Sequence, residues 1–246
     1  DFHREVFGSA VTPARRDIFE VDDKSPALDE DDRENFHSVT ALLLYIALRG
    51  RPDILLPVSF LCTRVGKATE QDDEKLLRVL KYLKGTLHLK YTLGADDLGA
   101  LKIWVDAAFA VHMDMRGHTG GVMSMGTGTF LNKSGKQKLN VLSSTECELV
   151  GASSYLQHVI WMCQFLEHQG YPMDEKIFYQ DNESAIKFAK NGGLSARKNS
   201  KHIDVRYFFI KDRLTNGGYV VEHCRTTKMI ADFFTKPLQG RLFRIL

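Results

Sequence analysis

Three acidic residues lie where strands are expected to end or helices to begin, and a fourth lies in an apolar segment. Asp106 lies within the apolar run IWVDAAFA, Asp181 follows the apolar run IFYQ, Glu146 begins a long helical pattern, and Asp232 lies among apolar residues. Carboxylates that converge repel one another, and divalent cations relieve that repulsion by accepting them as oxygen ligands. These four acids are therefore candidate metal ligands.

Each acid also has a purely structural interpretation. Ser143 with Glu146, and Thr145 with Glu148, fit the spacing of a capping box, and Asp181 is placed to cap the next helix. The large apolar residues of the helix, at 100° per residue, place Glu146 toward the sheet and Glu148 toward solvent. A carboxylate on the core side is costly unless it is paired, protonated or bound to a cation. Of the two, Glu146 is therefore the acid expected on the core side of the helix.

Strand and helix patterns alternate in the part of the chain that carries the acids. Three short strands are expected at 101–110, 121–125 and 139–143, followed by a long helix at 146–169 and a strand at 176–180. Helices at 183–190 and 200–214, a strand at 219–224 and a final helix before Pro237 complete the series. This order predicts an α/β fold with a mixed sheet.

Charge divides the chain into three segments. Residues 1–35 hold 11 acidic and 5 basic residues, residues 36–94 hold 5 and 9, and residues 95–246 hold 15 and 19. The formal net charge of +2 thus averages an acidic head and a basic body. Such an acidic head next to Pro26 predicts an exposed, partly disordered lead-in.

The middle segment has helical patterns at 36–48 and 73–84. Leu76, Leu77, Leu80 and Leu83 form an apolar stripe on the second of these. Its other face carries a basic row, which is either a solvated surface or a set of phosphate contacts: Lys75, Arg78, Lys81 and Lys84.

Composition excludes several classes of protein. No run of about 20 apolar residues predicts a membrane span, and no basic-then-apolar leader predicts secretion. The four cysteines contain no CxxC pair, so reduced thiols are expected rather than a structural zinc site. The chain begins with Asp1 rather than Met, so a fragment of a longer protein is expected.

Seven motifs follow one another over about residues 36–240: LLLYIA leading to RPDI at 42–54, RVLKYLKGT at 78–86, VDA at 105–107, LSSTECE at 142–148, DNESAI at 181–186, KHIDVRY at 201–207 and ADFFTKPL at 231–238. In this order they resemble the Pol polyproteins of copia-type LTR retrotransposons, specifically the end of the reverse transcriptase and the ribonuclease H domain.

The resemblance implies a fold and a division into domains. A ribonuclease H-like mixed sheet flanked by helices would occupy 95–240, with a tail at 241–246. A helical remnant of the reverse transcriptase thumb or connection would occupy 36–94, after the lead-in at 1–35. None of the Asp-Asp pairs has the aromatic residue and strand flanks of a polymerase palm, so this chain should not synthesise DNA by itself.

The resemblance also implies a site and a reaction. Asp106, Glu146, Asp181 and Asp232 would be catalytic ligands for two Mg²⁺ ions, or for Mn²⁺, in a two-metal cleavage of the RNA strand of RNA–DNA hybrids. The expected partners are the hybrid and the upstream palm and fingers of the polyprotein, and the expected location is the cytoplasm, in a retroelement particle. The expected nucleic-acid-binding residues are Lys75, Arg78, Lys81, Lys84, Arg197, Lys198, Lys201 and Arg206.

Departures and alternatives accompany this interpretation. Ala108 and Phe208 replace an acid and a histidine that the family often carries, and His202 and His223 are read as packing or surface residues. A catalytically inactive remnant that only binds nucleic acid would also retain these motifs. An integrase or transposase would require a DNA-joining acid triad and usually a zinc module, and neither is visible.

Overall fold

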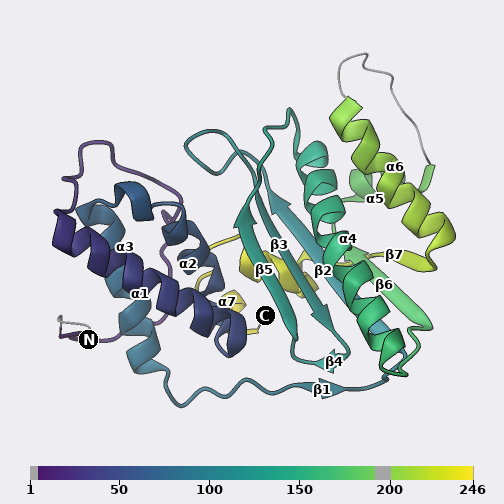
Figure 1. The fold of residues 1–246 in the computed structure, drawn as a ribbon, viewed down its shortest axis with the longest axis horizontal. Helices are drawn as coiled ribbons and strands as arrows, with labels where there is room; N and C mark the ends of the chain where they lie inside the picture. The colour runs from purple at the N-terminus through teal and green to yellow at the C-terminus, as the bar shows by residue number, and fades with distance from the viewer. Residues whose placement is uncertain (1–4, 192–200, 246) are drawn as a thin grey trace.

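The computed structural model describes residues 5–191 and 201–245. A five-stranded sheet forms its centre, in the order β5-β3-β2-β6-β7 (Figure 1). Strand β2 pairs antiparallel with β3 and parallel with β6, so the sheet is mixed. Its strands are β2 (Ala100–Ala108), β3 (His118–Ser124), β5 (Leu131–Lys136), β6 (Glu175–Gln180) and β7 (Tyr219–His223), and β1 (Gly94–Ala95) pairs with β4 (Gly126–Thr127) in a separate ribbon.

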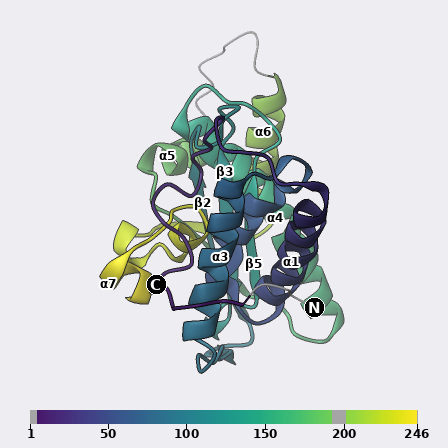
Figure 2. The same cartoon turned by 90° about the vertical axis from the view of Figure 1, so that its left-hand side faces the viewer.

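Helices cover both faces of the sheet. One layer consists of α4 (Ser144–His168), α5 (Glu183–Asn191) and α6 (Lys201–Asn216). The other side carries α1 (Glu30–Arg49), α2 (Leu55–Cys62) and α3 (Glu70–Gly85), which we call the helical unit, and Figure 2 views this side. Short elements complete the chain: η1 (Pro52–Ile54), η2 (Val65–Lys67), η3 (Thr226–Lys228), η4 (Ile230–Phe234) and α7 (Gly240–Ile245). The predicted α/β fold with a mixed sheet and flanking helices is confirmed.

Strand β2 serves both layers because its side chains alternate. Leu101, Ile103 and Val105 are fully buried in the core that α4 completes. Trp104 instead packs with the core of the helical unit, and Asp106 points to the same face as Trp104, toward η4.

Two consecutive glycines of β3 allow close packing on both faces. A Cβ on Gly121 would lie 2.4 Å from the ring of Tyr155 on α4. A Cβ on Gly120 would lie 2.8 Å from the carbonyl oxygen of Ala231 on η4. Neighbouring residues of a strand face opposite sides of the sheet. Gly121 therefore lets α4 pack directly on one face, and Gly120 lets η4 pack directly on the other.

The helical unit shares its core with the sheet. Helix α2 is almost wholly apolar and buries Val58 and Leu61 completely, and the same core takes in Val122 of β3 and Phe234 of η4. This helix was not predicted, because an eight-residue apolar segment has no amphipathic period to identify it.

The acidic run of the expected lead-in, residues 29–34, is exposed, but the described part of this segment is packed against the helical unit rather than disordered. Ile18 is only 2% exposed, and Asp29 caps α1 by accepting a hydrogen bond from the Asp32 N–H. The acidic run thus forms the first turn of α1, where negative charge complements the helix dipole.

The predicted strand at 139–143 is also wrong. The third strand of the sheet is β5, whose sequence LNKSGK is polar because it is a half-buried edge strand. Residues 139–143 instead lead into α4, with Val141 buried in the core. Among the residues that the structure describes, no helix has the length and apolar character needed to cross a bilayer.

Candidate metal centre

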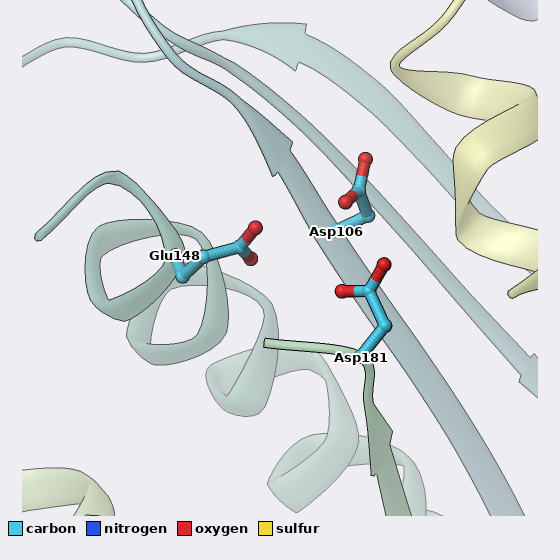
Figure 3. Close-up of side chains that lie close together, drawn as sticks. All are labelled: Asp106, Glu148 and Asp181. Atoms are coloured by element: carbon cyan, nitrogen blue, oxygen red, sulfur yellow. The ribbon is translucent and has the colours of Figure 1, made fainter. Parts of the chain in front are cut away.

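Three carboxylates from three elements converge at one edge of the sheet (Figure 3). Asp106 lies near the end of β2, Asp181 directly follows β6, and Glu148 lies near the start of α4. One oxygen of each lies within 4.8 Å of the others. Because β2 and β6 are parallel neighbours, their carboxyl ends meet at this edge, which explains why residues far apart in sequence lie together.

Burial and mutual repulsion make this cluster electrostatically strained. Burial raises the pKa of Glu148 well above its usual range, and the charges of Asp106 and Asp181 raise it further. The Gln180 amide opposes this by donating a hydrogen bond of 3.3 Å to the Glu148 carboxylate. Burial also raises the pKa of Asp106, against the nearby ammonium of Lys236.

A divalent cation of the hard, oxygen-preferring kind fits this donor set. All three ligand atoms are carboxylate oxygens, and a cation among them would compensate the repulsion that raises these pKa values. The residues therefore suit Mg²⁺ or Mn²⁺ better than the softer metals that thiolate and imidazole ligands select.

The structure brings Glu148, not Glu146, to the cluster. Glu146 accepts a hydrogen bond of 2.8 Å from the Leu142 N–H, while its own N–H donates to the Ser143 hydroxyl. The Ser143 hydroxyl thus caps α4, and the Glu146 carboxylate binds the backbone N–H of the residue before that cap. The prediction that Glu146 faces the sheet and Glu148 faces solvent is wrong, since Glu148 is 5% exposed.

The error has an identifiable cause on α4. A Cβ on Gly151 would lie 3.3 Å from Ala107 and Thr119, so this glycine lies directly on the sheet. Glu148, Gly151 and Tyr155 follow one another at helical spacing on that face. A buried stripe defined from the large apolar residues leaves out Gly151. A stripe that included this glycine would have identified Glu148 as a residue on the buried face.

Asp232 lies beside the cluster and is paired with a lysine. The Lys236 ammonium lies 2.7 Å from the Asp232 carboxylate and 3.5 Å from that of Asp106. The Thr235 hydroxyl donates a hydrogen bond to Asp106. Burial, and then the charge of Asp106, raise the pKa of Asp232 to about 6. Of the four predicted ligands, two belong to the converging group, Asp232 adjoins it through Lys236, and Glu146 lies apart.

The basic row on α3 holds the N-terminal segment. Lys75 donates a hydrogen bond to the Glu20 carbonyl, Arg78 donates to the Thr12 hydroxyl at 2.9 Å, and Lys84 donates to the Val6 carbonyl at 2.6 Å. Lys81 is half-buried. The structure thus assigns three of these four side chains to packing within the chain rather than to an open row of phosphate contacts.

The other predicted binding residues lie around α6. Arg206 donates hydrogen bonds of 2.8 Å to Ser153 and 3.2 Å to Ser154, so it joins α6 to α4. Arg197 and Lys198 lie outside the described residues, as do the side chains of Lys201 and His202, and His223 is exposed.

Sequence comparison finds relatives over most of this chain. It is 31% identical over 211 residues, 85% of its length, to the retrovirus-related Pol polyprotein from transposon TNT 1-94 of Nicotiana tabacum. It is 30% identical over 215 residues to the corresponding polyprotein from transposon RE1 of Arabidopsis thaliana. The chain spans only 16% and 14% of the length of these relatives. No family model matches the chain.

Similar solved structures include two kinds of protein. The foamy viral protease-reverse transcriptase in complex with an RNA/DNA hybrid is 13% identical, over 91% of this chain and 28% of that one, with a TM-score of 0.48. Ribonuclease H1 from the archaeon Halobacterium salinarum is 15% identical, over 55% of this chain and 94% of that one, with a TM-score of 0.40.

Proposed function

Because the chain is homologous to a part of the retrovirus-related Pol polyproteins of copia-type plant transposons, as its motifs predict, we propose that it is a metal-dependent ribonuclease H-type endonuclease. Its reaction would be hydrolysis of the RNA strand of RNA–DNA hybrids. The observation that carries this proposal is the convergence of Asp106, Glu148 and Asp181 at the edge of the sheet.

These three residues would hold Mg²⁺ ions, and the two-metal arrangement remains part of the proposal. When bound, such ions polarise a phosphate and lower the pKa of a coordinated water. The protein's own contribution is position. Gln180 orients the Glu148 carboxylate, and Thr235 orients that of Asp106, so both are directed into the site before substrate arrives.

Lys236 and Asp232 form a second part of the site. The ammonium of Lys236 balances the charge of both Asp232 and Asp106. It thereby adds a positive group at the place where the phosphate of a nucleic acid would approach. We assign Asp232 the role of holding this lysine, in addition to the ligand role that the family resemblance implies.

We infer the substrate from the family resemblance. Nothing in the proposed reaction requires contacts with the bases. A hybrid is recognised through its groove shape and its 2′-hydroxyls, so cleavage should show no sequence preference. In the intact polyprotein, the reverse transcriptase palm and fingers would adjoin the helical unit, and α1 offers exposed side chains for that contact, Leu42, Tyr45 and Leu48.

Cleavage of a hybrid labelled on its RNA strand tests the proposal. Wild-type protein with Mg²⁺ or Mn²⁺ should cut the RNA strand of the hybrid and leave duplex DNA intact. Asp181→Asn should lower the rate by about a hundredfold or more, because it removes one charged ligand. Absence of metal-dependent cleavage by folded wild-type protein, or full activity of Asp181→Asn, would reject the proposal.

A further inference from the structure

A chain of buried polar groups runs between the sheet and the helical unit. His112 Nε2 lies 3.0 Å from His118 Nδ1, and His118 Nε2 lies 2.7 Å from the Ser134 hydroxyl. The Ser134 hydroxyl in turn donates a hydrogen bond of 2.7 Å to the carbonyl oxygen of Phe234. Both histidines are buried, and neither belongs to the metal centre.

The direction of these hydrogen bonds is determined by the serine. Its single proton goes to Phe234, so it must accept a hydrogen bond from His118 Nε2–H. Burial lowers the pKa of His118 to about 3 and that of His112 to about 4, so both rings are neutral at neutral pH. His118 therefore accepts at Nδ1 from His112 Nε2–H, and the proton donors all point toward Phe234.

The N-terminal segment and the helical unit hold the two imidazoles in place. The ring of Phe19 lies 5.1 Å from His112 and 5.2 Å from His118, between ring centroids, and Phe60 of α2 stacks on His112. The Ser59 hydroxyl donates a hydrogen bond of 2.7 Å to the carbonyl of Ser134.

Three charged groups surround this cluster. Lys136 of β5 and Asp114 act on His112 from the sheet side and lie 2.7 Å apart. Lys75 of α3 lies 4.9 Å above the ring of Phe60 on the helical side.

The series of hydrogen bonds through His112, His118 and Ser134 ends at Phe234, next to the metal centre. Phe234 is the last residue of η4, and Thr235, which follows it, donates to Asp106. Asp232, on the same turn, holds Lys236. Gly120 lets η4 pack directly on β3, and the bond from Ser134 to Phe234 ties the end of η4 to β5.

We propose that His112, His118 and Ser134 are positioning residues for the metal centre, which set the place of η4 and hence of Asp106 and Asp232 through the Phe234 carbonyl. The helical unit is then a structural part of the nuclease site. This inference rests on the proposed function insofar as the acids bind metal.

Ser134→Ala tests the inference in a Trp161→Phe background. Trp161 is 57% exposed on α4, and its removal leaves Trp104 as the only tryptophan. Trp104 packs against the small cluster of Cys224, Met229 and Ala231, the last of which belongs to η4. Ser134→Ala should shift the Trp104 emission to longer wavelength and weaken Mn²⁺ binding about tenfold, the scale of losses on removing outer-shell partners. Ser134→Thr keeps the hydroxyl and should restore both signals, and Gly135→Ala, with no atom within 4 Å of its Cβ, is the matched control.

The outcomes separate the inference from the proposed function. If Ser134→Ala lowers the melting temperature but leaves Trp104 emission and Mn²⁺ binding unchanged, the inference is overturned. If Ser134→Ala does not fold, His112→Phe is the second variant, because a phenyl ring suits the surrounding rings and only the first hydrogen-bond donor is removed. It should give the same shift in Trp104 emission and the same loss of Mn²⁺ affinity. Unchanged emission and affinity in His112→Phe overturn the inference. If wild-type protein neither binds Mn²⁺ nor cleaves a hybrid, the proposed function fails. In that case the emission wavelength of Trp104 still tests the positioning of η4, and an unchanged wavelength in Ser134→Ala would overturn it.

Discussion

Glu148 is a buried acid with two further carboxylates beside it. It is buried between Asp106 and Asp181, and the Gln180 amide is its hydrogen-bonding side-chain neighbour. A carboxylate in this setting is stable either protonated or beside a cation. Its protonation state is therefore coupled to metal binding.

Glu148→Gln should separate metal binding from folding. The amide removes a repelling charge, so the metal-free protein should melt at a higher temperature than wild type. The stabilisation that Mn²⁺ gives wild type, about 3 kcal/mol at a hundred times its dissociation constant, should be largely lost. Thermal unfolding with and without Mn²⁺ measures both effects.

Glu146→Gln is the matched control, two positions away on the same helix. It should retain the Mn²⁺ stabilisation and lose at most about 1 kcal/mol through a weakened cap at Leu142. If the two variants exchange these behaviours, Glu146 is the ligand after all.

Lys236 is the second residue whose charge matters at this scale. Its ammonium lies next to Asp106, so it competes electrostatically with a bound cation. Lys236→Met should therefore tighten Mn²⁺ binding by about three- to tenfold, as expected for removing one partly solvated charge. Calorimetric titration at constant ionic strength measures this, with Lys187→Met, on an exposed pair of α5, as the control. Weaker binding in Lys236→Met would mean that the lysine mainly orders the acids.

The element that decides the geometry of the site is η4. It is a short 3-10 turn that packs on the sheet below it and accepts a hydrogen bond from Ser134 at its last residue. Gly120 permits that contact, since its backbone directly underlies Ala231, Phe234 and Thr235. A small change in β3 should therefore act on the acids at a distance.

Gly120→Ala should displace η4. The added methyl group would lie under 3 Å from three atoms of η4 and Thr235, and overpacking of this kind costs about 1–3 kcal/mol. The variant should lose stability in urea unfolding and also lose Mn²⁺ affinity. Gly135→Ala on β5 should change neither. An unaffected Mn²⁺ affinity in Gly120→Ala would show that η4 does not support the metal centre.

For the whole molecule, buried titratable groups of opposite sign set the dependence of stability on pH. Burial lowers the pKa of His112 to about 4, so between pH 6.5 and 4 the unfolded chain binds more protons and stability falls on acidification. Burial raises the pKa of Asp232 to about 6, so over roughly the same range the folded metal-free protein binds more protons there, which acts in the opposite direction.

His112→Phe isolates the histidine contribution. On going from pH 7.5 to pH 5, wild type should lose about 1–2 kcal/mol more unfolding free energy than this variant. Urea unfolding at the two pH values measures the difference. Equal losses would indicate that His112 is solvated and titrates normally in the folded protein.

Much of the fold follows from local patterns along the chain. The apolar runs at 101–110 and 176–180 predicted the strands β2 and β6, and the family resemblance assigned Asp106 and Asp181 to one site. The ordered motifs also predicted the family, which the sequence relatives confirm. These features are readable because a strand's period and its end depend only on neighbouring residues.

Only the tertiary structure determined which segment packs against each face of a helix or strand. Periodicity places Glu146 and Glu148 around a helix axis, but the sheet beneath Gly151 determines which of them is buried. Likewise, a basic row on α3 has the same pattern whether water, phosphate or residues 5–28 cover it. The sequence by itself determined the fold class, the strand-end acids and the family. Packing between distant segments determined that Glu148 is the third carboxylate of the cluster, that Lys236 pairs with Asp232 and Asp106, and where η4 lies on the sheet. Close contact depends on the shape of both surfaces and not on the sequence pattern of either one.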